Sequence, residues 1–182
     1  DSLEQRCMFK ENQIITKNLR QRITSLNPGG RAPDFVLVEE GKPTKTLFNF
    51  EKKHIYIHFF DPESEQTSKE IPLLNQLNQM YGQYVQFVSV YKSGSLSEKG
   101  KKRISAINWD VYGLPASSSI WKNYSIETFP QYTLIDAVGY IVSSPALSPT
   151  PNGQYETIDK TFFYLKKAWE KEHTTEQDDQ RN

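Results

Sequence analysis

Residues 54–90 read HIYIHFFDPESEQTSKEIPLLNQLNQMYGQYVQFVSV, and this stretch decides the fold class. Its first seven residues, His54–Phe60, are dense in β-branched and aromatic side chains at both odd and even positions. This pattern is typical of a strand buried on both faces of a sheet that contains parallel pairs. Apolar residues then recur at helical spacing from Thr67 to Tyr81, and Val85–Val90 is a second apolar strand. The order strand, helix, strand predicts a βαβ unit with a right-handed crossover, and hence an α/β fold.

Two further elements are expected before this unit. Residues 3–26 carry apolar side chains at three- and four-residue steps, which predicts an amphipathic helix, and the Pro and paired Gly of Asn27–Gly30 end it. Phe35–Val38 and Thr46–Phe50 are candidate extended segments on either side of a turn at Glu39–Pro43, so we expect a hairpin there.

The second half of the chain predicts more of the same sheet. Residues 92–108 are rich in Lys, Ser and Gly, and we interpret them as a solvated loop with at most one helical turn; its basic residues at 99–103 are assigned no function. The other expected elements are a short Ser-capped helix at Ser117–Tyr124, a hairpin of Gln131–Ile135 with Tyr140–Ser143, and an amphipathic helix from Ile158 to Trp169. After Glu172 the sequence is polar, and we expect a disordered tail.

Composition limits the possible functions. The 182 residues include 22 Lys or Arg and 22 Asp or Glu, so the net charge is +0 and nothing in the overall charge favours nucleic acid or an anionic membrane. The hydrophobic fraction of 36% suffices for one domain with a single core. Apolar runs stay far below the roughly 20 residues that cross a bilayer, so we expect no direct membrane insertion.

Cysteine and histidine are scarce. Cys7 is the single cysteine, which excludes an intrachain disulfide, a CxxC pair and a multi-cysteine zinc site. His54 and His58 lie four positions apart, about 13 Å along a strand, which is too far to share a metal ion. We therefore expect neither a metal nor a cofactor.

Three motifs, in order, resemble the extracytoplasmic TlpA/ResA-like family of thioredoxin-like thiol-disulfide oxidoreductases. Arg31–Phe35 (RAPDF) resembles that family's APDF lead-in, and His58–Pro72 (HFFDPESEQTSKEIP) resembles its active-site segment F-W-A-x-W-C-x-x-C-x-x-E-x-P. Phe129–Asp136 (FPQYTLID) with Gly139–Val142 resembles the stretch that carries a cis-proline, LID and G-x-I-V. The resemblance covers about residues 31–170 and implies a three-layer α/β/α sandwich with a mixed central sheet and an N-terminal hairpin.

The chain departs from the family at its reactive centre. With Lys69–Pro72 as the anchor, the two cysteine positions fall on Ser64 and Thr67, so no catalytic residue of the family kind is expected. A hydroxyl cannot replace the low-pKa thiolate that attacks a disulfide. Both residue types are favoured N-caps, and we interpret them mainly as helix caps. A serine nucleophile at Ser64 has no evident base or nucleophile elbow in the sequence, so hydrolase chemistry is a remote alternative.

The resemblance also points to a binding surface. If the Phe129–Pro130 bond is cis, the family's peptide-binding groove is retained, with Phe60, Ser64 and Thr67 beside it. Phe60, Phe129 and Tyr132 then form an apolar patch for a protein partner, although core packing explains these aromatic residues equally well. Cys7 lies about 57 positions before Ser64, and we interpret it as a small apolar helix residue, with a free reactive thiol as the minor alternative.

These observations lead to one main hypothesis. We expect a helical segment and linker at 1–30, a thioredoxin-like domain at 31–172 and a tail at 173–182, and the start at Asp1 suggests the later part of a longer or membrane-tethered chain. The domain is expected to be redox-inactive and to bind a protein or peptide, with no nucleic acid, in the periplasm or cell envelope that the resemblance implies. The alternatives are an oxidoreductase that uses a partner's cysteines or Cys7, and a purely structural domain of a larger envelope protein.

Overall fold

A central five-stranded sheet organises the computed structural model, which describes residues 26–38, 44–50, 53–151 and 156–179. The strand order is β5-β4-β3-β6-β7. Strand β3 pairs parallel with β4 and antiparallel with β6, β4 pairs parallel with β5, and β6 pairs antiparallel with β7. The strands are β3 (His54–Phe60), β4 (Val85–Lys92), β5 (Asp110–Leu114), β6 (Gln131–Ile135) and β7 (Ile141–Ser143).

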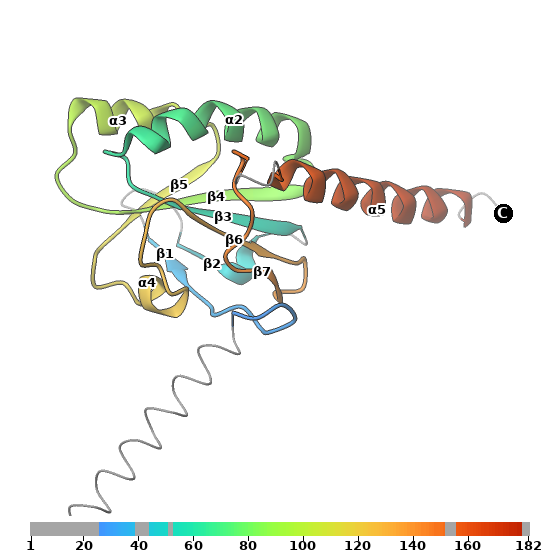
Figure 1. Cartoon of the computed structure of the whole chain (residues 1–182). Helices are drawn as coiled ribbons and strands as arrows, with labels where there is room; N and C mark the ends of the chain where they lie inside the picture. Colours follow the sequence, from blue (N-terminus) through green and yellow to red (C-terminus); the bar gives the residue numbers. More distant parts are fainter. Residues whose placement is uncertain (1–25, 39–43, 51–52, 152–155, 180–182) are drawn as a thin grey trace, which may run out of the picture.

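Helices cover both faces of this sheet (Figure 1), which gives the three layers that the family resemblance implies. One face carries α2, α3 and α5; the other carries α4 and a two-stranded antiparallel sheet, β1–β2, followed by a short 3-10 helix, η1. Their bounds are α2 (Glu65–Tyr81), α3 (Glu98–Ser105), α5 (Ile158–Asp179), α4 (Ser119–Asn123), β1 (Val36–Leu37), β2 (Lys45–Thr46) and η1 (Leu47–Asn49).

Alternation along β3 supplies both cores. Tyr56 and Phe60 point toward the layer of α2, α3 and α5, where Tyr56 packs with Leu74 and Phe162, and Phe60 packs with Ile71. Ile57 and its odd-numbered neighbours face α4 and the small sheet. All seven residues except His54 are buried. Continuous burial is the pattern expected of a central strand with helices on both faces, and it confirms the prediction made from the HIYIHFF run.

The structure corrects three expectations. Residues 92–108 hold a two-turn helix, α3, and they lead into an edge strand, β5, that the sequence pattern did not indicate. In the expected hairpin the second strand is Lys45–Thr46, so Leu47–Asn49 is helical instead of extended. Helix α5 continues to Asp179, beyond the point where a disordered tail was expected. The predicted helix at 3–26 and the turn at 39–43 lie almost wholly outside the described residues.

Helix α3 escaped the sequence analysis because it has almost no apolar stripe. Only Ile104 packs from it against the core. Ser97 caps its first turn by accepting the Gly100 N–H at 3.0 Å, and Arg103 binds the loop before α2. Polar contacts and capping therefore hold an element that hydrophobic periodicity cannot detect.

Candidate functional site

The first turn of α2 begins where β3 ends, at the edge of the sheet that commonly carries the functional groups of α/β proteins. Ser64 is the N-cap, and its hydroxyl accepts the Gln66 N–H at 3.2 Å. Thr67 is fully buried, and its hydroxyl donates to the Asp61 carbonyl at 2.6 Å, which ties the helix to the end of β3. Both hydroxyls are thus engaged in backbone contacts, although Thr67 is not the cap that its residue type predicted.

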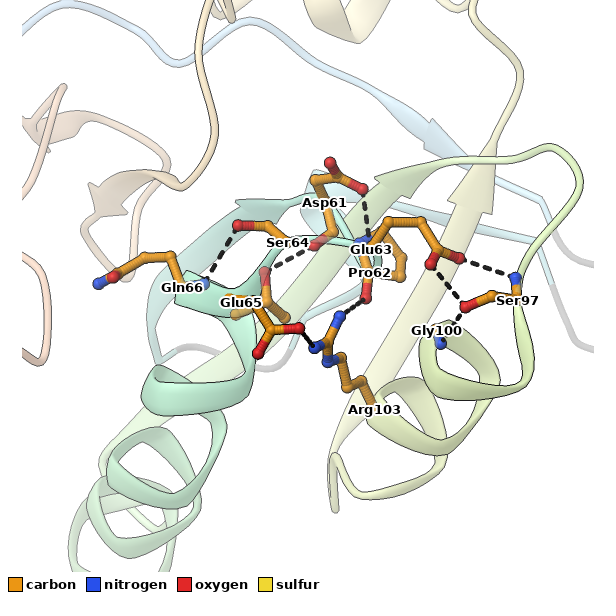
Figure 2. A network of polar contacts seen from close by, with 10 residues as sticks. Asp61, Pro62, Glu63, Ser64, Glu65, Gln66, Ser97, Gly100 and Arg103 are labelled. Atoms are coloured by element: carbon orange, nitrogen blue, oxygen red, sulfur yellow. Dashed lines mark hydrogen bonds and ion pairs between the residues drawn. The ribbon is translucent and has the colours of Figure 1, made fainter.

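The loop before α2 is fastened to α3 (Figure 2). The Glu63 carboxylate accepts the Ser97 N–H at 2.8 Å and the Ser97 hydroxyl at 2.6 Å. Arg103 forms an ion pair with Glu65 at 2.6 Å and donates to the Pro62 carbonyl at 3.0 Å. The Ser97 hydrogen bonds lower the pKa of Glu63, and the Arg103 guanidinium lowers the pKa of Glu65. Two carboxylates therefore flank Ser64, which opposes an anionic nucleophile at that position.

A buried carboxylate lies one turn further along α2. Glu70 is only 1% exposed and accepts hydrogen bonds from the Tyr132 hydroxyl at 2.6 Å, the Gln66 side-chain amide at 2.9 Å and the Thr150 hydroxyl at 3.3 Å. All three donors are neutral. Burying a carboxylate costs free energy unless hydrogen bonds satisfy its oxygens. The three hydrogen bonds to Glu70 offset this cost and fix the position of its side chain.

Tyr132 also belongs to a column of four aromatic rings between the sheet and α2. The rings follow in the order Tyr56, Tyr132, His58, Phe60, with centroid separations of 5.2, 5.0 and 4.8 Å. His58 is fully enclosed: its Nδ1 lies 3.1 Å from Ser89 Oγ, its Nε2 has no partner, and burial lowers its pKa to about 3. The imidazole is therefore a neutral core residue.

The loop before β6 approaches the sheet from the other side. Its Phe129–Pro130 peptide bond is cis. The Phe129 ring packs edge-on against Trp121 at 6.2 Å, and the Lys92 ammonium lies 5.5 and 5.6 Å from the centroids of these two rings. Phe129 is thus a half-buried member of the α4 layer.

A pocket of about 770 Å³ connects this loop to the buried acid. Glu70, Pro130 and Tyr132 all line it, together with residues 142–143, residues 145–148 and the start of α5. Pockets that hold small molecules or side chains measure roughly 300–1,000 Å³, so this one is large enough for a ligand group. Neither Ser64 nor Thr67 lines it.

The predicted binding residues are only partly brought together. Phe60 and Tyr132 are buried in the core, at 0% and 3% exposure, and Phe129 lies on the opposite face of the sheet. The expected apolar patch of these three aromatic residues is therefore wrong, and core packing accounts for them. Of the expected set, only Pro130 and Tyr132 line the pocket.

Known proteins share this arrangement of strands and helices. The sequence matches no family model and no curated protein. The structure matches the thioredoxin domain of a thiol-disulfide oxidoreductase from Bacteroides vulgatus (TM-score 0.56, 24% identity, 67% of this chain and 90% of that one). The chain has a thioredoxin-like fold. A thiol:disulfide interchange protein from Bacteroides sp. is also similar (TM-score 0.56, 23% identity, 65% of this chain and 81% of that one). So is a thioredoxin-like protein from Bacteroides caccae (TM-score 0.58, 14% identity, 86% of this chain and 55% of that one).

In this thioredoxin-like domain, hydroxyl residues stand at both positions where the family resemblance places cysteines. Cys7 lies outside the described residues. No group of three or more His, Cys, Asp or Glu side chains in the described residues is arranged to hold a metal ion. No helix in that part of the chain is long and apolar enough to span a membrane.

Two features of the site were missed by the sequence analysis. Glu70 follows the same helical stripe as Leu74, Leu77 and Tyr81, and it stands at the E of the family's E-x-P motif, so both its place on a buried face and the motif could have identified it. Arg103 has no such signal in the sequence, because its partners precede it by about 40 positions.

Proposed function

We propose that this thioredoxin-like domain binds a protein or peptide partner in the cell envelope and does not itself exchange thiols for disulfides. The observation that carries the proposal is the engagement of Ser64 and Thr67 as a helix cap and a backbone clamp. In a dithiol enzyme these positions supply a nucleophilic thiolate and a resolving thiol. Hydroxyls have a far higher pKa and can do neither.

The setting of Ser64 further supports a redox-inactive domain. The positive end of a helix dipole lowers the pKa of a cysteine thiol at the N-terminus. Here Glu63 and Glu65 place two negative charges in that turn, and α3 holds both of them there. Such an arrangement suits a rigid loop better than a reactive one.

The resemblance to extracytoplasmic proteins supports a location in the cell envelope. The pocket beside Pro130 supports the binding of a protein or peptide partner. The main rival is an oxidoreductase that uses Cys7 or a partner's cysteines. A third possibility is a structural domain of a larger envelope protein, which would have no free partner.

Reduction of insulin disulfides by dithiothreitol distinguishes a redox-inactive domain from an oxidoreductase that uses Cys7. In an enzyme-catalysed cycle, a protein thiolate attacks an insulin disulfide, forms a mixed disulfide and releases one insulin thiol. A second thiol, of the protein or of dithiothreitol, cleaves the mixed disulfide and releases the other insulin thiol, and dithiothreitol ends as its own disulfide. We expect the wild-type chain and Cys7→Ser to match the uncatalysed rate. Turnover by the wild type that Cys7→Ser abolishes would overturn the proposal and identify Cys7 as the reactive thiol.

A further inference from the structure

The pocket beside Pro130 has firm walls. One wall is made by residues 145–148, which lie in the segment that leads from β7 toward α5. The Ala146 N–H donates to the Tyr132 carbonyl at 2.8 Å, and the Tyr56 hydroxyl donates to the Leu147 carbonyl at 2.7 Å. These contacts fix the segment against the sheet, so the pocket is formed before any ligand arrives.

Its chemistry is that of an anionic site with apolar and neutral sides. Pro130, Ala146 and Leu147 offer apolar surface, whereas Glu70 brings the single carboxylate among the lining residues. The three hydrogen-bond donors of Glu70 are neutral, and no Lys or Arg in the described part of the chain forms an ion pair with it. Burying a carboxylate without a paired cation costs free energy, which a cationic ligand group would offset.

We propose that this pocket receives a lysine or arginine side chain of a peptide partner, with the cationic end paired to Glu70. The inference rests on the proposed peptide-binding function and names the group that is recognised. The apolar walls match the methylene stem of a basic side chain, and the carboxylate matches its charged end. The occupant is a side chain of a peptide, so a free amine is expected to bind less well because it lacks the flanking backbone.

Titration of the ¹⁵N-labelled protein with capped five-residue peptides tests this directly. The peptides are identical except for a central lysine, arginine or norleucine, and cadaverine serves as the free amine. We expect the lysine and arginine peptides to bind at least tenfold more tightly than the norleucine peptide and than cadaverine. The shifted amide signals should be those of Thr128, Ser143, Ala146 and Thr161.

Substitution of single glutamates tests whether Glu70 is the carboxylate that pairs with the basic side chain. Glu70→Gln should remove the preference for lysine over norleucine, whereas Glu127→Gln, which removes an exposed carboxylate next to Thr128, should leave it intact. If Glu70→Gln does not fold, the peptide series on the wild type still decides. Equal binding of lysine and norleucine peptides overturns this inference and leaves peptide binding standing. Absence of binding by every peptide, or equally tight binding of cadaverine, overturns it as well, and the insulin assay remains an independent test of redox inactivity.

Discussion

Acidification should destabilise this protein through one buried histidine. His58 is 1% exposed, and burial lowers its pKa from 6.5 to about 3. Between these two values the unfolded chain binds a proton that the folded chain does not, so the free energy of unfolding falls as the pH falls. The stability is fully present above the unfolded pKa of 6.5 and is lost progressively toward pH 3.

The expected loss is large for a domain of this size. Each pH unit within the window is worth about 1.4 kcal/mol, so His58 alone should cost about 2.5 kcal/mol between pH 7 and pH 4.5. Native domains have a total stability of roughly 5–15 kcal/mol, so this loss is readily measurable.

The assay compares the wild type with His58→Phe by urea denaturation, followed by tryptophan fluorescence at several pH values. Phenylalanine keeps a ring between Phe60 and Tyr132, so the ring stack is preserved while the titration is removed. The loss of the Ser89 contact changes the stability of the variant equally at all pH values. His54, whose pKa burial also lowers, is present in both proteins and cancels in the difference.

We expect the stability difference between the two proteins to change by about 2.5 kcal/mol in favour of His58→Phe when the pH is lowered from 7 to 4.5. Parallel curves over this range would refute the reasoning, because they would mean that His58 takes up its proton without unfolding. A stability difference that changes with pH only above pH 6 would refute it equally, since that range lies at the pKa of an exposed histidine.

Two substitutions test single contacts near the site by urea denaturation. Thr67→Val keeps the buried shape but removes the hydroxyl that binds the Asp61 carbonyl. It should lower the free energy of unfolding by only about 1 kcal/mol, because that carbonyl still accepts the Ser64 N–H. A variant more stable than the wild type would contradict a stabilising role for the Thr67 hydroxyl. Gly113→Ala places a Cβ 2.7 Å from the Tyr91 ring and should lower the free energy of unfolding by about 1 kcal/mol. Gly94→Ala is the control, because its Cβ has no atom within 4 Å and the stability should not change. Equal stability of the two variants would disprove the close contact at Gly113.

The order β3, α2, β4 followed from sequence because each element carries its own apolar pattern. His54–Phe60 is dense in β-branched and aromatic residues, and the stripe of Ile71, Leu74 and Leu77 marks α2. Strand β5 carries no such pattern, since it has five residues, of which one is Asp110 and one is Gly113. Its position is fixed by pairing with β4, which is a tertiary contact that local sequence does not encode.

The candidate site divides in the same way. The capping role of Ser64 followed from residue type, because serine at a helix start satisfies a free N–H. Thr67 has the same preference, yet burial turned its hydroxyl toward the end of β3. The pocket could not be predicted, since Glu70 meets Thr150 across 80 positions and the residues that line the pocket come from four separate segments.

The central claim is that this thioredoxin-like scaffold lacks dithiol chemistry because hydroxyls occupy positions 64 and 67. The most direct measurement is insulin reduction by the wild type beside Ser64→Cys/Thr67→Cys. We predict no turnover above the dithiothreitol background for the wild type and clear turnover for the double variant, slowed by the carboxylates of Glu63 and Glu65. Turnover by the wild type, or a folded double variant without activity, would contradict the account.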